Sequence, residues 1–149
     1  MNRNAEKITI TASTCTALRL RKAARRITQI YDQELQPYGL TITQFGLLGH
    51  LKSFDGISIG ALAEKLIMDP TTLTRNLRPL TRRGLVALDA DPKDRRGRCL
   101  RLTPDGRAAY DHGKPGWARA QRHIEDVLGE AGSTALNTSV DHMLARLAD

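Results

Sequence analysis

The sequence lacks the features that mark secreted, membrane-spanning and disulfide-stabilised proteins. Its 149 residues include two cysteines, Cys15 and Cys99, and no Cys-x-x-Cys spacing, which argues against a disulfide framework and a structural zinc site. No apolar run approaches the roughly 20 residues that span a bilayer, and residues 1–13 contain no apolar signal core. We therefore expect a soluble, cytoplasmic protein with reduced thiols and no membrane partner.

The patterns of an enzyme or a metalloprotein are also missing. The four histidines, His50, His112, His123 and His142, have no ligand-like spacing to one another or to cysteine. There is no glycine-rich phosphate loop and no nucleophile elbow. The sequence therefore predicts neither an enzyme nor a bound metal or other cofactor.

Positive charge, in contrast, is abundant and concentrated. The chain has 23 Lys and Arg against 16 Asp and Glu, a formal charge of +7 and a pI near 9.9. Residues 71–101 alone contain nine basic side chains and three acidic ones, so one fifth of the chain carries nearly all of the net charge. This concentration is typical of a surface that meets a polyanion, and a nucleic acid is the first candidate.

Helices are expected before this basic stretch. Apolar side chains recur every three or four residues within residues 14–36, which indicates an amphipathic helix that Pro37 ends. Thr41 and Gln44 have the spacing of a capping box and predict the start of a second helix, which ends before Asp55.

Two more cap signals follow along the chain. Ser58 can cap a short third helix, because its hydroxyl oxygen can accept a hydrogen bond from a backbone N–H. Asp69 followed by Pro70 predicts the start of a fourth helix, because proline at the first helical position loses no hydrogen bond. Gly84 is expected to end this helix.

Beyond Gly84 the periodicity changes. Residues 85–89 and 98–102 are short β-prone runs, and the polar stretch 90–97 between them reads as a hairpin loop. Thr103 then predicts the start of a fifth helix, with a kink or break near Lys114, where proline and glycine interrupt it. Residues 131–148 are expected to form the final helix.

Helix, short turn, helix and basic hairpin is the order of a winged helix-turn-helix, in which the second helix enters the major groove. That helix is residues 70–83 here, and its leucines recur at a spacing that directs them to the core. Its polar side chains offer the groups that hydrogen-bond base edges and phosphates. We expect DNA contacts from Thr71, Thr72, Thr74, Arg75, Asn76 and Arg78 in the helix and from Lys93, Arg95, Arg96 and Arg98 in the hairpin.

Six short motifs occur in a fixed order along the chain. They are Leu40-Thr41-x-x-Gln44, Leu62-Ala63-Glu64-x-Leu66, Thr72-Leu73-Thr74-Arg75, Gly84-Leu85-Val86, Asp91-Pro92-x-Asp94-x-Arg96 and Leu102-Thr103-x-x-Gly106. Together they resemble the MarR family (multiple antibiotic resistance regulators) of bacterial transcription factors. The resemblance implies a mainly α protein with a small β-hairpin wing. Residues 1–149 would form one domain, with dimerisation helices at about 14–36 and 104–149 and a winged helix-turn-helix lobe at about 41–102.

The resemblance also implies a function. Members of the family are homodimers, and this chain would bind a pseudo-palindromic double-stranded DNA operator, as a ligand-responsive repressor associated with the bacterial nucleoid. Two recognition helices about 34 Å apart would read the half-sites. Asp94 would brace Arg96, which would place its guanidinium in the minor groove from the wing tip. The order Pro115-Gly116-Trp117 implies one kinked, continuous helix.

Regulation in this family commonly acts through a cleft between the dimer layer and the DNA-binding lobe. The resemblance therefore implies a small aromatic or phenolic effector. On matching positions, the walls of the cleft would include Tyr31, Tyr38, Phe45, Leu48 and His50. The competing interpretation of these residues is that they belong to the core.

Two alternative functions stay open on the sequence. Some MarR-type peroxide sensors carry a reactive cysteine near the start of the first helix, hydrogen-bonded to tyrosines, and Cys15 and Tyr31 match part of that pattern. Cys15 lies about two residues too early, and Arg21 stands at the second tyrosine position. The other alternative is a sequence-indifferent architectural nucleic-acid-binding protein, which would show salt-dependent affinity without operator preference.

A second basic cluster lies in the first helix, away from its apolar stripe. It consists of Arg19, Arg21, Lys22, Arg25 and Arg26. These side chains are either solvated or paired with acidic residues of a partner copy, or they contact DNA phosphates as an auxiliary surface.

Overall fold

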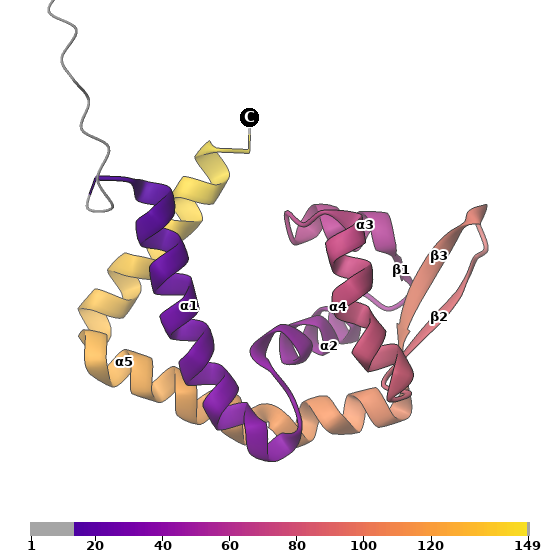
Figure 1. Ribbon diagram of the computed structural model, residues 1–149, viewed down its shortest axis with the longest axis horizontal. Helices are drawn as coiled ribbons and strands as arrows, with labels where there is room; N and C mark the ends of the chain where they lie inside the picture. Colours follow the sequence, from indigo (N-terminus) through magenta and orange to yellow (C-terminus); the bar gives the residue numbers. More distant parts are fainter. Residues whose placement is uncertain (1–13, 149) are drawn as a thin grey trace, which may run out of the picture.

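The computed structural model describes residues 14–148, which fold into a mainly helical structure with a small antiparallel sheet. In chain order the elements are α1 (Thr16–Leu35), the 3₁₀ helix η1 (Gln36–Tyr38), α2 (Ile42–Ser53), β1 (Ile57–Ser58), α3 (Ile59–Lys65), α4 (Pro70–Arg82), β2 (Val86–Asp91), β3 (Asp94–Leu102) and α5 (Pro104–Arg146). In Figure 1, α2, α3, α4 and the sheet form one part, α1 and the end of α5 form another, and the first part of α5 runs beneath both. This is the predicted fold class.

The predicted helix starts are confirmed by the caps that form them. The backbone N–H of Gln44 donates to Oγ1 of Thr41 at 3.2 Å, and Oε1 of Gln44 accepts the N–H of Thr41 at 3.1 Å. Ser58 caps α3, and Asp69 caps α4 with Pro70 in its first turn. Each of these side chains satisfies a backbone donor that has no partner within the helix.

Buried leucines hold α4 against the rest of this part. Leu73, Leu77 and Leu80 of α4 are at most 3% exposed. They belong to one core with Leu48 of α2 and Leu100 of β3. The predicted division of α4 into an apolar inner face and a polar outer face is therefore confirmed, and the outer face is left to meet a partner.

The predicted hairpin is confirmed, but its loop is not as expected. Regular pairing joins 86–90 to 98–102, close to the predicted strands, and the pair Asp91 and Asp94 then extends the ladder with a shifted register. The expected loop 90–97 is therefore wrong: the turn itself is two residues, and residues 95–97 bulge between the two pairings. Carboxylates cause this, because Asp91 and Asp94 accept backbone N–H groups within the tip at 2.8 and 3.0 Å.

A third strand was not predicted from the sequence. Ile57 of β1 pairs with Leu100 and Ser58 pairs with Cys99, so β3 is the central strand in the order β1-β3-β2. Two residues are too short a run to show the alternation that identifies a strand.

The long helix α5 departs from the prediction in one place. Residues around Lys114 and Pro115 keep helical backbone angles. The helix is interrupted instead at Gly129, with φ 72° and ψ 163°, which agrees with the predicted final helix from residue 131. The expected break near Lys114 is therefore wrong, and the expected continuity through Pro115 is confirmed. Close packing overrides the weak propensity, since Gly113 and Gly116 are both buried at this point. Within residues 14–148, no helix is long and apolar enough to cross a membrane.

Candidate functional site

The outer face of α4 is an open polar surface. Thr71, Thr74, Arg75 and Arg78 are exposed there, and with Pro70 they line a hollow of about 460 Å³. Their spacing places them on the face opposite the buried leucines. The structure thus brings together four of the six helix residues that were predicted to contact DNA.

The other two predicted residues of α4 lie differently. Thr72 is exposed, and its backbone N–H donates to Oδ2 of Asp69 at 3.3 Å as part of the helix cap. Asn76 is half-buried, and its Nδ2 lies 3.8 Å from the sulfur of Met68. Asn76 therefore turns toward the segment between α3 and α4, at the edge of the polar face.

The arginines of the wing are divided between its tip and its two faces. Arg98 pairs with Ala90 on the side that carries buried Leu100, and this side packs against α4. Arg95 and Arg96 belong to the bulge at the tip, beside the turn residue Lys93. Because paired residues of an antiparallel ladder point to the same side, Arg98 lies on the face that α4 shares.

The positive charges of this surface are not neutralised internally. None of the four ion pairs formed within residues 14–148 involves Arg75, Arg78, Arg96 or Arg98. Arg101 differs, because it forms an ion pair with Asp89 on the outer face of the wing. The surface formed by α4 and the wing tip is therefore a cationic patch suited to phosphates.

Asp94 supports the wing tip through the backbone. Its Oδ1 accepts the N–H of Arg96 at 3.0 Å. Asp94 therefore braces Arg96 through the backbone and not through the guanidinium. The guanidinium of Arg96 forms no ion pair within residues 14–148.

A second hollow, of about 650 Å³, lies between α2 and α5. Phe45 and His50 of α2 line it together with Tyr110, Lys114 and Trp117 of α5. The ring of Phe45 stacks on Tyr110 at a centroid distance of 4.7 Å and on Trp117 at 6.4 Å. Sequence reasoning missed Tyr110 and Trp117, because the glycines and proline between them suggested a helix break.

The remaining residues of the predicted cleft lie elsewhere. Leu48 is fully buried in the core. Tyr31 donates its hydroxyl proton to Gln121, and the hydroxyl of Tyr38 accepts from Arg119 at 3.2 Å. Of the five predicted wall residues, the structure brings only Phe45 and His50 to the hollow between α2 and α5.

The two cysteines are in unrelated surroundings. Cys15 is half-buried at the start of α1, and Tyr31 lies about 24 Å away along the same helix, where its hydroxyl donates a hydrogen bond to Gln121. Cys99 lies on β3, where desolvation and the nearby carboxylate of Asp91 raise the pKa of its thiol. A raised pKa disfavours the reactive thiolate of Cys99.

The basic cluster of α1 is exposed. Arg19, Lys22, Arg25 and Arg26 line an open hollow of about 490 Å³ with Gln29, and none of the cluster forms an ion pair within residues 14–148. The cluster is therefore accessible in a single copy of the chain.

A core-anchored helix with an open polar face, next to a basic hairpin, defines a winged helix-turn-helix DNA-binding protein. The model of the MarR family matches residues 38–97. The multiple antibiotic resistance protein MarR of Salmonella typhimurium is 33% identical over 108 residues, which cover 71% of this chain and 75% of that protein.

Solved structures agree in fold over most of the chain. The Mycobacterium tuberculosis transcriptional regulator MosR in complex with DNA is 33% identical, with a TM-score of 0.76 over 89% of this chain and 97% of that one. Bordetella bronchiseptica BpsR, solved to explain how 6-hydroxynicotinic acid regulates its DNA binding, is 28% identical with a TM-score of 0.79, over 90% and 96%. The chain belongs to the MarR family and is a DNA-binding transcriptional regulator.

Proposed function

We propose that the chain is a ligand-responsive repressor that binds a pseudo-palindromic double-stranded DNA operator as a homodimer. The observation that carries the proposal is the exposed polar face of α4 beside Arg95, Arg96 and Arg98 of the wing, which form no ion pair within residues 14–148. In this arrangement Arg75 and the threonines of α4 read base edges in the major groove, and Arg96 enters the minor groove. Phosphates are contacted by Lys93, Arg95 and Arg98. The carboxylate of Asp94 fixes the backbone of the wing tip through the N–H of Arg96.

Exposed apolar side chains support the homodimer. Leu18 and Leu20 of α1 are 48% and 40% exposed, and Leu136, Leu144 and Leu147 near the end of the chain are 41%, 46% and 74% exposed. Side chains of this kind on helices outside the DNA-binding part are what a second copy covers. We assign the dimer layer to residues 14–36 and 104–149 and the DNA-binding lobe to residues 41–102.

The hollow between α2 and α5 supports the response to a ligand. It lies between a helix of the DNA-binding lobe and a helix of the proposed dimer layer, so an occupant can change how the two are placed. Stacked aromatic rings and Lys114 line it, which favours a small aromatic or phenolic effector. The regulation of DNA binding of BpsR by 6-hydroxynicotinic acid is consistent with this class.

The proposed role is binding, and it involves no catalytic step, metal or other cofactor. It places the protein in the bacterial cytoplasm, at the nucleoid.

The test is a titration of the protein into its own upstream intergenic DNA and into a scrambled duplex, followed by fluorescence anisotropy at physiological salt. We expect a preference of roughly 10³-fold or more for the intergenic DNA. Equal, steeply salt-dependent binding to both duplexes would favour the sequence-indifferent architectural protein. Reporter expression with and without the protein then decides between repression and activation.

A further inference from the structure

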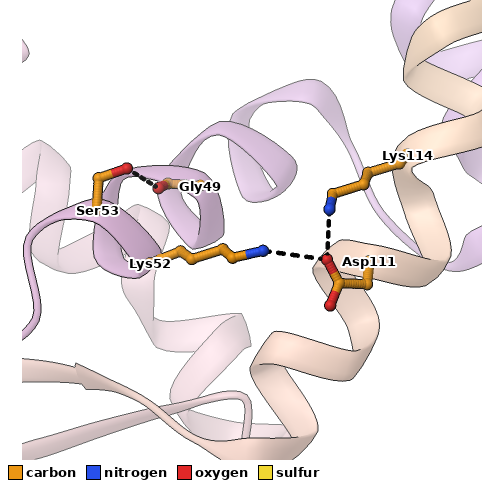
Figure 2. A network of polar contacts seen from close by, with 5 residues as sticks. All are labelled: Gly49, Lys52, Ser53, Asp111 and Lys114. Carbon is orange, nitrogen blue, oxygen red and sulfur yellow. Dashed lines mark hydrogen bonds and ion pairs between the residues drawn. The ribbon is translucent and has the colours of Figure 1, made fainter.

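Two lysines share one carboxylate oxygen at the edge of the hollow between α2 and α5. Oδ1 of Asp111 lies 2.6 Å from Nζ of Lys114 and 3.2 Å from Nζ of Lys52 (Figure 2). Lys52 comes from α2, whereas Asp111 and Lys114 come from α5. The group has two positive charges and one negative charge, so one positive charge remains.

This positive charge lies beside aromatic surface. The Nζ atoms of Lys52 and Lys114 are 5.2 and 5.3 Å from the centroid of the Tyr110 ring. Tyr110 and Lys114 both line the hollow, whereas Asp111 does not, and no acidic side chain is among its lining residues. Lys114 therefore lies between an apolar hollow with no anion of its own and the carboxylate beside it.

The contact between Lys114 and Asp111 is exchangeable. The two side chains are 49% and 47% exposed, and ion pairs at such positions are weak because water competes with them. Hydrogen bonds from Lys114 and Lys52 lower the pKa of Asp111, so the carboxylate is charged at neutral pH. An anion that enters the hollow thus meets an ammonium group that a neighbouring carboxylate already occupies.

We propose that Asp111 is an internal competitor for the anionic group of the effector: an aromatic monoanion in the hollow binds Lys114 in place of Asp111. This inference rests on the proposed function and adds the residue that opposes binding of the effector's anionic group. Asp111 is a positioning residue, since it acts through Lys114. Its consequence is a higher effector concentration for half-occupancy of the hollow.

Trp117 provides the measurement. It is the single tryptophan of the chain and lines the hollow, so its fluorescence reports on the occupant. The probes are benzoate, as an aromatic monoanion, and benzamide, as its neutral counterpart of similar shape. We expect Asp111→Asn to lower the Kd for benzoate about two- to fivefold, the upper part of the range of a weak exposed ion pair, and to leave the Kd for benzamide unchanged.

Two further variants show whether the effect passes through Lys114. Lys114→Gln should remove the advantage of benzoate over benzamide, and Asp111→Asn added to it should no longer tighten benzoate binding. Asp126→Asn is the matched control, because it removes the same charge from an exposed position of α5 that forms no ion pair within residues 14–148. Circular dichroism confirms that each variant is folded.

Three results would overturn the inference. An unchanged benzoate Kd in Asp111→Asn would show that the carboxylate does not compete. Equal tightening of both probes would assign Asp111 a role in the shape of the hollow. Absence of saturable quenching by either probe would exclude the hollow as a site for aromatic monoanions. Operator binding by the same samples, measured by anisotropy, tests the DNA-binding function separately.

Discussion

Gly106 of α5 packs against the backbone of Leu85: a Cβ built on Gly106 would lie 2.0 Å from the carbonyl oxygen of Leu85. The same carbonyl accepts the N–H of Thr103 at 3.2 Å, and Oγ1 of Thr103 accepts the N–H of Gly106 at 3.0 Å. The start of α5 and the base of the wing therefore meet backbone to backbone. This contact fixes the wing relative to α5.

We predict that Gly106→Ala lowers the free energy of unfolding by about 2–4 kcal/mol, because the new methyl group must displace main-chain atoms. Gly46→Ala on α2 is the matched control, since its Cβ would meet nothing within 4 Å. That substitution should raise the free energy of unfolding by about 0.5–1 kcal/mol through helix propensity. Urea denaturation measures both. Similar values for the two variants would show that the packing at Gly106 is not as close as described.

Within residues 14–148, one non-glycine residue has a positive φ, and it lies between α3 and α4. Ile67 has φ 51° and is 78% exposed. Its β-branched side chain therefore occupies the unfavourable left-handed region, and little burial of the side chain offsets the strain. We predict that Ile67→Gly raises the free energy of unfolding by about 1 kcal/mol, because glycine adopts this conformation without steric cost. Ile67→Val keeps the branch and should change little. A loss of stability in Ile67→Gly would reveal a contact of the isoleucine that one copy of the chain does not contain.

The cap signals and the leucine spacing of α4 were sufficient to predict the helix-turn-helix, because they depend on residues within one or two turns. Other features depend on tertiary contacts. Pro115 is tolerated inside α5 because the glycines beside it are buried, which the sequence does not show. The hollow was predicted only at Phe45 and His50, since its other wall comes from α5, far along the chain.

Substitution can separate the base contacts proposed for α4 from the contacts proposed for the wing tip. We predict that Arg75→Ala costs about 1–3 kcal/mol of operator affinity and relaxes base preference at one position of each half-site. Arg96→Ala should weaken binding more uniformly across sequences. Arg101→Ala is the matched control, because its charge is already paired with Asp89 on the outer face of the wing. Anisotropy titrations against a set of single-base operator variants measure the three. An equal loss in Arg96→Ala and Arg101→Ala would contradict the assignment of the wing tip.

The thiol-sensing alternative is tested at Cys15. We predict that Cys15→Ser leaves the peroxide response of operator binding unchanged, because Tyr31 lies about 24 Å along the same helix, donates its hydroxyl hydrogen bond to Gln121 and does not activate the thiol. Operator affinity is measured before and after peroxide treatment, with Cys99→Ser in parallel. A wild-type protein that peroxide releases from DNA, next to a Cys15→Ser variant that it does not release, would establish the alternative.

The hollow between α2 and α5 is open beside Gly46. Gly46 lines it, and a Cβ at this position would extend into open space. We predict that Gly46→Leu fills the hollow, abolishes quenching of Trp117 by benzoate and lowers operator affinity, because the leucine acts as a permanent occupant between α2 and α5. Gly46→Ala adds a single methyl group and should retain most of the quenching. If Gly46→Leu kept full quenching, benzoate would bind outside the hollow; if it left operator affinity unchanged, occupation of the hollow would not control DNA binding.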